Sequence, residues 1–212
     1  PFFRAAQGVR VPAELTLFVD NAARGRESGE LQLTKEGFSG IAVFQLSLFA
    51  GRALAEKRKT ELCINFLADF TADTDFFARR LSLPFATDLE AVGNGLVPKN
   101  LWGALLRRAA LTPQQAVKRG DWELAKRLSA ALTASRFTLQ GLGSLEKAQV
   151  SAGGIALSEL SGQSLSFRRV PGLYAAGEIL NVTGPCGGYN LHWCFASGLS
   201  AGQSAASDEV KI

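Results

Sequence analysis

A long stretch without charged side chains constrains this chain most: residues 179–207 contain no Asp, Glu, Lys or Arg. Its length would permit a membrane-spanning helix. However, Asn181, Pro185, Asn190 and several glycines lie in it, and a hydrocarbon core does not accept so many polar and helix-breaking residues near one end of a span. The stretch is therefore predicted to be a buried loop and a helix in a soluble protein, with no membrane partner.

β-Branched and aromatic residues at 14–20, and alternating apolar and polar residues at 30–34, predict strands in the first third of the chain. Residues 14–20 and 30–34 are expected to form a hairpin, with a long polar loop at 21–29 between them. Residues 61–67 predict a further strand that places Leu62, Ile64 and Phe66 on one face. Between these strands, Ser39 is predicted to cap a helix that runs to Lys57. Its apolar spacing comes from Ile41, Phe44, Gln45 and Leu48.

The hydrophobic period changes to that of helices between about residues 72 and 135, and this region is expected to be almost wholly helical. Helix starts are predicted at four capping or proline positions: Asp73 or Thr74, Pro98, Thr112-Pro113 and Asp121. The helix after Asp121 would direct one apolar face to the core, made by Trp122, Ala125, Leu128 and Leu132. These stripes indicate core packing and no functional role.

Strand character returns after Ser135 and again at residues 148–156. Residues 173–176 then predict a short apolar strand of the kind that is buried on both faces in a parallel sheet. Gly177 and Glu178 end that strand, a glycine-rich loop covers residues 184–188, and a helix follows over 190–206.

The order strand, glycine loop and helix predicts a ligand site. A carboxylate such as Glu178, at the carboxyl end of a buried parallel strand, lies where open α/β sheets bind ligands, and it can accept hydrogen bonds from hydroxyl groups. Glycines let backbone N–H groups approach a ligand closely. The helix N-terminus offers unpaired N–H groups to phosphates or to the electron-rich C2 carbonyl region of a reduced flavin. Ordinary α/β packing without a ligand is the alternative at this point.

The sequence motifs resemble those of a family of bacterial flavoproteins. GLYAAGE at 172–178, GGYNLHW at 187–193 and SGLSAG at 197–202 are similar to the C-terminal flavin-binding signature of NAD(FAD)-utilising dehydrogenases related to aminoacetone oxidases. Gly37-Phe38-Ser39-Gly40 is similar to that family's Gly-x-Ser-Gly turn, and residues 139–157 resemble its return into the cofactor domain. The resemblance spans most of the chain.

The resemblance implies an α+β architecture with a cofactor fold similar to glutathione reductase. Residues 1–150 would be an inserted β-rich domain with the helical subdomain at about 72–135. Residues 151–212 would be the C-terminal strand-loop-helix piece of a dinucleotide-binding α/β domain that binds FAD. The cofactor-binding residues would be Gly177, Glu178, Gly184, Gly187, Gly188, Tyr189, Asn190 and Leu191.

Other residues give weaker signals. Cys63, Cys186 and Cys194 are an odd number of cysteines without a framework spacing, so they are expected to be reduced thiols of a cytoplasmic protein. No CxxC or Cys/His cluster predicts a metal. Cys186 lies in a glycine loop at a helix N-terminus, which can lower the pKa of a thiol, but it has no CxxC partner, so a catalytic thiol is not favoured. For His192, packing or a hydrogen bond to a backbone group is favoured over an acid–base role. No catalytic residue is assigned.

The function expected from the sequence is that of an FAD-dependent oxidoreductase, with an unknown small-molecule substrate and a nicotinamide nucleotide as a further partner. The alternative is a non-enzymatic binding or interaction module. The basic pairs are scattered over a chain with a net charge of +4, so no nucleic-acid partner is expected. The chain begins at Pro1, contains no Met and has no Gly-x-Gly-x-x-Gly after a strand. We therefore expect a segment of a longer protein that is inactive and does not retain FAD by itself.

Overall fold

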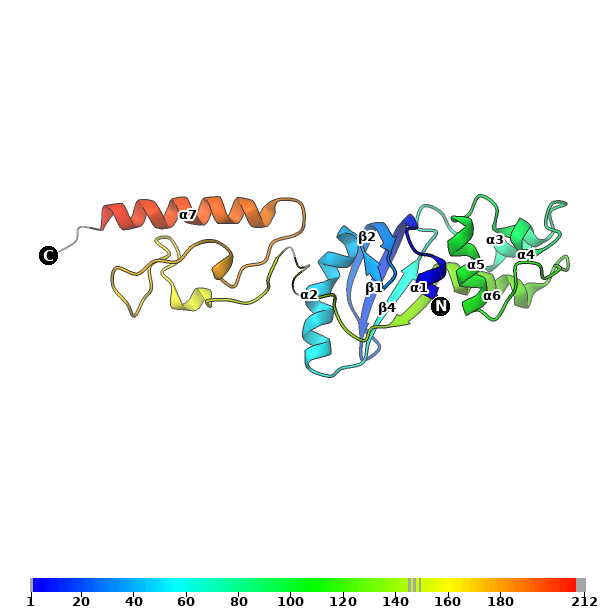
Figure 1. Cartoon of the computed structure of the whole chain (residues 1–212), viewed down its shortest axis with the longest axis horizontal. Helices are drawn as coiled ribbons and strands as arrows, with labels where there is room; N and C mark the ends of the chain where they lie inside the picture. The colour runs from blue at the N-terminus through cyan, green and yellow to red at the C-terminus, as the bar shows by residue number, and fades with distance from the viewer. Residues whose placement is uncertain (1, 145, 147, 149, 209–212) are drawn as a thin grey trace. The chain divides into compact units, whose positions relative to one another are not determined.

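The computed structural model describes residues 2–144, 146, 148 and 150–208. The chain forms two compact units, Pro1–Leu142 and Gly143–Ile212, called unit 1 and unit 2 below. Figure 1 colours unit 1 from blue to green and unit 2 from yellow to red. Among the helices of the described ranges, none has the length and apolar character needed to cross a membrane.

Unit 1 contains one five-stranded antiparallel sheet with the strand order β3-β2-β1-β4-β5. The strands are β1 (Arg10–Val19), β2 (Ala22–Leu33), β3 (Phe38–Ser39), β4 (Thr60–Asn65) and β5 (Ser135–Thr138). Every second residue of β1 is buried, from Val11 to Val19. The strand predicted at 14–20 is confirmed as the second half of β1, and Leu62, Ile64 and Phe66, which were predicted to share one face, are all buried.

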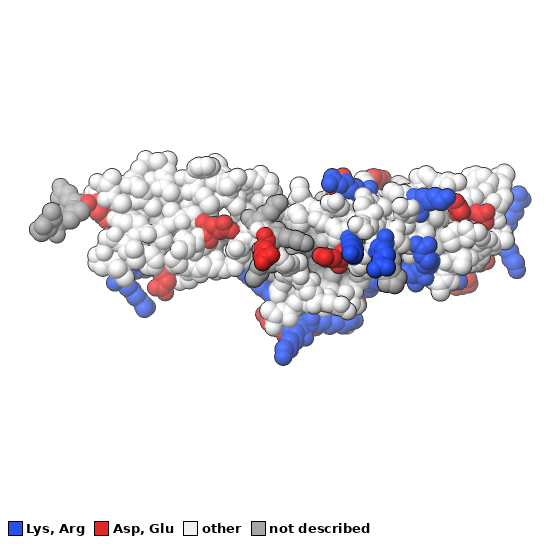
Figure 2. Space-filling view, in the orientation of Figure 1, with Lys and Arg blue, Asp and Glu red and all other residues white. Residues whose placement is uncertain are grey.

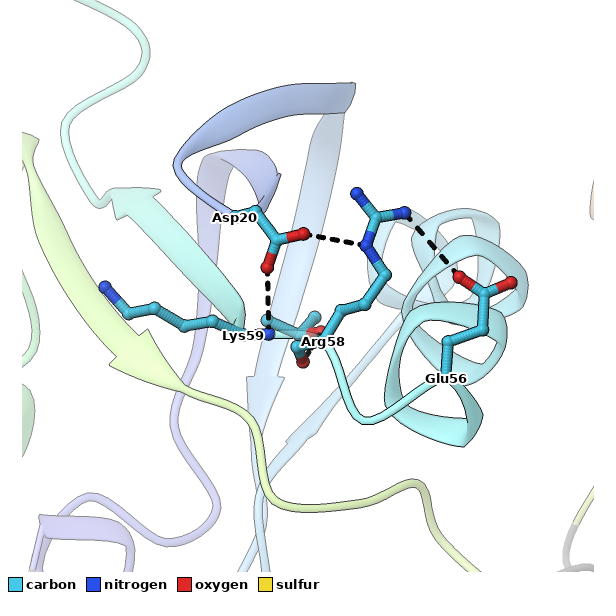
Figure 3. Close-up of polar contacts among 5 residues, drawn as sticks. Asp20, Glu56, Arg58 and Lys59 are labelled. Atoms are coloured by element: carbon cyan, nitrogen blue, oxygen red, sulfur yellow. Dashed lines mark hydrogen bonds and ion pairs between the residues drawn. The ribbon is translucent and has the colours of Figure 1, made fainter.

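The hairpin between β1 and β2 turns at two residues, so the long loop predicted at 21–29 is wrong. Asp20 and Asn21 adopt φ values of 50° and 65°, as a tight hairpin turn requires at both central positions. Asp20 also ties this turn to the start of β4, as Figure 3 shows: its Oδ2 accepts from Arg58 Nε at 2.8 Å and its Oδ1 from the Lys59 N–H at 3.1 Å.

Two glycines in β2 are packing positions and not loop signals. A Cβ on Gly25 would lie 2.8 Å from Leu46 Cδ2, and one on Gly29 would lie 3.6 Å from Ala42 Cβ. Leu46 and Ala42 belong to α2 (Ile41–Ala55), which covers one face of the sheet. The absence of a β-carbon therefore lets the helix approach the strand closely.

The start and the buried face of α2 also differ from the prediction. Gly40 is the N-cap residue, without a side-chain cap hydrogen bond, and Ser39 lies in β3. Ile41 and Phe44 are 63% and 43% exposed. The buried face consists mainly of small residues, Ala42, Leu46, Ala50 and Ala53. Small side chains face the sheet because the helix packs close to the glycines of β2.

The helical part of unit 1 confirms two predicted caps. Its helices are α3 (Thr74–Leu81), α4 (Leu89–Gly93), α5 (Lys99–Arg108) and α6 (Trp122–Thr133), and a short α1 (Phe2–Ala5) precedes β1. Asp73 accepts a hydrogen bond from the Phe76 N–H, and Asp121 accepts one from the Leu124 N–H. Ala125, Leu128 and Leu132 are buried as predicted, whereas Trp122 is 50% exposed.

The helix predicted at Thr112-Pro113 does not form, so residues 72–135 are less helical than expected. The carbonyl groups of Pro113 and Gln115 accept hydrogen bonds from the N–H groups of Glu90 and Leu89 at 2.8 and 3.1 Å. The segment thus holds the N-terminus of α4, a helix that the apolar periodicity did not predict. A contact between distant segments overrides the local proline signal here.

The described part of unit 2 includes the 3-10 turns η2 (Leu157–Glu159) and η3 (Gly177–Ile179) and the long helix α7 (Tyr189–Ser207). Its small core contains Leu160, Leu165, Leu180 and Ala201. The predicted helix at 190–206 is confirmed and begins one residue earlier.

The strand predicted at residues 173–176 is wrong. Tyr174 makes only an isolated antiparallel bridge with Ser166, and Leu173 is 45% exposed. Across 148–156, the described residues contain one bridge, between Ile155 and Leu180. A strand buried on both faces needs neighbouring strands to pair its backbone groups, and the described part of unit 2 supplies none beside this segment.

Candidate functional site

The residues predicted to bind a ligand lie in η3, in the loop that follows it and in the first turn of α7. Gly177 joins η3 to the middle of α7 through both of its backbone groups. Its N–H donates to Ser197 Oγ at 2.9 Å, and its carbonyl oxygen accepts from Trp193 Nε1 at 3.2 Å. Gly177 has a φ of 79°, which favours glycine.

Glu178 is exposed and contacts a neighbouring segment of unit 2. Its Oε1 accepts a hydrogen bond from the Ser151 N–H at 2.7 Å. The next residues align the same two segments, because Ile155 N–H donates to Ile179 O and Asn181 N–H donates to Ile155 O, both at 2.9 Å. One oxygen of the carboxylate thus joins η3 to the segment at Ser151.

Asn190 shapes the glycine-rich loop. Its Oδ1 accepts from the Gly184 N–H at 2.8 Å, and its Nδ2 donates to Gly184 O at 3.1 Å. The carboxamide therefore satisfies both backbone groups of Gly184. A Cβ on Gly184 would lie 3.1 Å from Tyr189 Cβ, so the loop folds closely against the start of α7.

The other end of the loop is open. Gly187 and Gly188 have φ values of 114° and 95°, and no described heavy atom lies within 4 Å of a Cβ built on either. Gly188 is the N-cap residue of α7 and provides no side-chain cap hydrogen bond. N–H groups at the start of a helix lack intrahelical partners. Tyr189 and Leu191 beside them are 63% and 67% exposed.

The three cysteines lie in β4, in the glycine-rich loop and in α7. None of the three cysteines forms a disulfide. Cys194 lies beside Gly177, whose β-carbon position is 3.6 Å from Cys194 Sγ. Burial raises the pKa of the Cys63 thiol in β4, which disfavours a reactive thiolate there. Across the described ranges, no group of three His, Cys, Asp or Glu residues is arranged to hold a metal ion.

Three supporting residues were missed by the sequence reasoning. Ser197 and Trp193 hold Gly177 from one face of α7, and the backbone of Ser151 holds Glu178. The sequence did contain a signal for Ser197 and Trp193. Together with Ala201 they recur every four residues, and this spacing marks the face of α7 that packs on the rest of unit 2. No local pattern could pair Ser151 with Glu178.

A glycine loop that leads into a helix N-terminus is the kind of element that nucleotide-binding domains use to hold anionic groups. Consistent with this class, residues 16–204 match the family described as the HI0933-like protein Rossmann domain. The chain belongs to this family, and the family resemblance given by the sequence is thereby confirmed.

Curated relatives of known activity are similar to the chain. The 3-dehydro-bile acid delta(4,6)-reductase of Clostridium scindens is 35% identical over 212 residues, which cover 97% of this chain and 51% of that protein. The ribosomal RNA dihydrouridine synthase of Escherichia coli is 31% identical over 198 residues, or 92% of this chain and 46% of that protein. The enzyme of the same name from Haemophilus influenzae is 26% identical over 197 residues. The chain spans about half the length of these relatives.

Proposed function

We propose that the protein is an FAD-dependent oxidoreductase. Residues 151–212 would be the C-terminal part of its FAD-binding domain, and residues 1–150 its inserted β-rich domain with the helical subdomain at 72–135. The observation that carries this proposal is the open glycine loop at the N-terminus of α7, on a chain that belongs to a Rossmann-domain family.

The residues of the loop fit a flavin in chemical terms. Gly187 and Gly188 leave space for a planar ring to approach the backbone, and the first N–H groups of α7 suit an electron-rich carbonyl or a phosphate. Asn190 fixes the loop in this form before any ligand binds, which lowers the ordering cost of binding. Tyr189, Leu191 and Gly184 complete the proposed set.

The exposure of α7 supports its assignment to a larger domain. Leu191, Phe195 and Leu199 recur every four residues and are 67%, 77% and 64% exposed. They lie on the side of α7 opposite Ser197 and Ala201, which are buried against the rest of unit 2. A helix that is apolar on two opposite faces is typical of one buried between layers. We infer that the exposed face packs on another part of the FAD-binding domain.

Glu178 would accept a hydrogen bond from a hydroxyl of the flavin's ribityl chain. Its Oε1 is held by the Ser151 N–H, so the carboxylate is oriented before the ligand arrives. When bound, the flavin would supply the two-electron chemistry. The residues of this chain would bind and orient it.

The names of the relatives support a proposal for the class of reaction. A bile acid reductase and a dihydrouridine synthase are both named for adding hydrogen to an unsaturated substrate. We therefore propose a reduction of this kind, with a nicotinamide nucleotide as the electron donor. This chain shares only a quarter to a third of its residues with the relatives, so the substrate itself stays unassigned.

The test uses the protein prepared with its whole natural sequence. We expect yellow protein with the absorbance of bound flavin, and FAD titration into the apoprotein should give saturable binding. Glu178→Gln keeps an acceptor for the Ser151 N–H but removes the charge. A charge-assisted hydrogen bond contributes about 1.5–3 kcal/mol, so FAD affinity should fall roughly ten-fold to a hundred-fold.

The matched control is Glu159→Gln, which removes the same charge from another exposed carboxylate of unit 2. FAD affinity should not change in this variant. Unchanged affinity in Glu178→Gln would remove Glu178 from the proposed site. A natural-length protein that binds no flavin at all would refute the proposed function and leave the binding module as the alternative.

A further inference from the structure

Three arginines from separate elements of unit 1 line one groove. Arg108 ends α5, Arg127 lies in α6 and Arg136 lies in β5. The groove has a volume of about 330 Å³. The rest of its lining is small or apolar and consists of Leu105, Ala109, Ala130, Ala131, Ala134 and Ser135. The basic residues are scattered along the sequence, but the fold brings these three side chains together. We call this feature the arginine groove.

Neighbouring groups hold each guanidinium in place. Arg108 donates to the carbonyl oxygen of Arg136, and its guanidinium lies 4.1 Å from the ring centroid of Phe137. Arg127 Nη2 donates to Ala109 O at 2.7 Å. The Arg136 guanidinium lies 4.1 Å from the ring centroid of Phe18. A guanidinium offers five N–H donors, so these contacts leave most donors of all three arginines available.

The positive charge of the arginine groove is poorly neutralised. Its lining contains no Asp or Glu. Within the described ranges, Arg108 and Arg127 form no ion pair, and Arg136 lies 3.6 Å from Glu61, a carboxylate that also contacts Lys59 at 3.1 Å. Unit 2 contributes only Lys147, Arg168, Arg169 and Lys211 to the 23 basic residues of the chain. Figure 2 accordingly shows most blue side chains over unit 1.

Capping of helix ends explains only part of this arrangement. Arg127 binds the carbonyl of Ala109, the C-cap residue of α5, as basic side chains often do at helix C-termini. That role uses one donor of one residue. It does not require three guanidiniums in one groove whose lining contains no carboxylate, so the groove is suited to an anionic partner.

We propose that the arginine groove binds the phosphodiester backbone of a nucleic acid. Guanidinium groups match phosphate oxygens in charge and fork geometry. Apart from the arginines, the lining contains Leu105, four alanines and Ser135, so it offers no amide or aromatic side chain that could read base edges. Contacts of this kind position a nucleic acid without specifying its sequence. The proposal does not depend on the flavin, because unit 1 alone supplies these residues.

The test is the binding of a fluorescein-labelled RNA hairpin to the whole chain, measured by fluorescence anisotropy at several salt concentrations. Binding should weaken steeply with salt, because phosphate contacts release counterions. Arg127→Gln should reduce affinity roughly ten-fold at low salt and lower the salt slope by about 1. Arg127→Lys, which keeps the charge but loses the fork, should give an intermediate affinity.

The matched control is Lys126→Gln, which removes the same charge from the neighbouring exposed position of α6, outside the groove lining. Its affinity should fall clearly less than that of Arg127→Gln, because Lys126 lies outside the groove lining and solvent and salt screen an exposed charge that makes no direct phosphate contact. Circular dichroism of each variant checks that it folds. Equal losses in Arg127→Gln and Lys126→Gln, or no saturable binding to the unaltered chain, would overturn the proposal. Displacement of the hairpin by equal molar inorganic phosphate would reduce the groove to a simple anion site and also overturn it.

Discussion

Gly153 and Gly154 allow a sharp test of how the candidate site is held together. Both have positive φ values, 108° and 123°. No described heavy atom lies within 4 Å of a Cβ on Gly153, whereas a Cβ on Gly154 would lie 2.3 Å from Ile179 O. Alanine at 153 therefore introduces backbone strain alone, and alanine at 154 introduces the same kind of strain together with a collision against backbone.

The two substitutions differ in the hydrogen bonds that they break. Strain at positive φ costs about 1–3 kcal/mol, and the loss of glycine's unfolded-state freedom offsets up to about 1 kcal/mol of it. Gly153→Ala should thus lower local stability by about 0–3 kcal/mol. Gly154→Ala must also separate Ile155 from Ile179, which breaks the two 2.9 Å bonds made by the Ile155 and Asn181 N–H groups. At about 0.5–1.5 kcal/mol each, these bonds add about 1–3 kcal/mol.

Amide hydrogen exchange at Ile155 and Asn181 measures this local opening directly. The amides should exchange roughly five-fold to a hundred-fold faster in Gly154→Ala than in Gly153→Ala, which is the difference of about 1–3 kcal/mol expressed as a rate ratio. Amides of β1, such as that of Leu15, should be unaffected in both variants because they belong to unit 1. Equal exchange in the two variants would show that the segments around Glu178 are not held by this close approach.

Two further predictions concern Asn190 and Asp20. Asn190→Ala removes both hydrogen bonds to Gly184, so the free energy of local unfolding should fall by about 1–3 kcal/mol. Faster hydrogen exchange of the Gly184 amide would measure this loss, and an unchanged exchange rate would mean that another group holds the loop. The hydrogen bond from the Arg58 side chain lowers the pKa of Asp20 below its ordinary value of 3.8. A lowered folded-state pKa stabilises the fold above the ordinary value, and this contribution is lost as pH falls through the folded value. The urea midpoint should therefore decline from pH 4 downward, and less steeply in Asp20→Asn; identical pH dependence would contradict the role of this pair, which is drawn in Figure 3.

Local signals were sufficient where the responsible groups lie within a few residues of one another. Asp73 and Asp121 cap helices through N–H groups three residues away, and the alternation in β1 reflects one buried face. Gly25 and Gly29 were misinterpreted because a glycine has two uses, in turns and at close contacts. Only the position of α2 decides between these uses, and that position is a property of the folded chain.

The same limit explains the errors in unit 2. An apolar tetrapeptide at 173–176 predicts a buried strand only if other strands lie on both sides of it, and the described residues provide one isolated bridge to Ser166. The helix that follows needs no such partner, because its hydrogen bonds are internal, so α7 was predicted to within one residue.

The candidate site contains both local contacts and contacts between distant segments. This difference determines how substitutions in the site should be interpreted. The glycine loop and the start of α7 are local, since Asn190 reaches Gly184 only six residues away, and this part was predictable from sequence. The orientation of Glu178 depends on Ser151, and the position of Gly177 depends on Ser197, contacts that span 27 and 20 residues. Substitutions in the loop should therefore act on ligand binding with small effects on the rest of unit 2. Substitutions at Ser197 should displace η3 and α7 together, so a loss of ligand binding there reports the fold of unit 2 and not contact with a ligand.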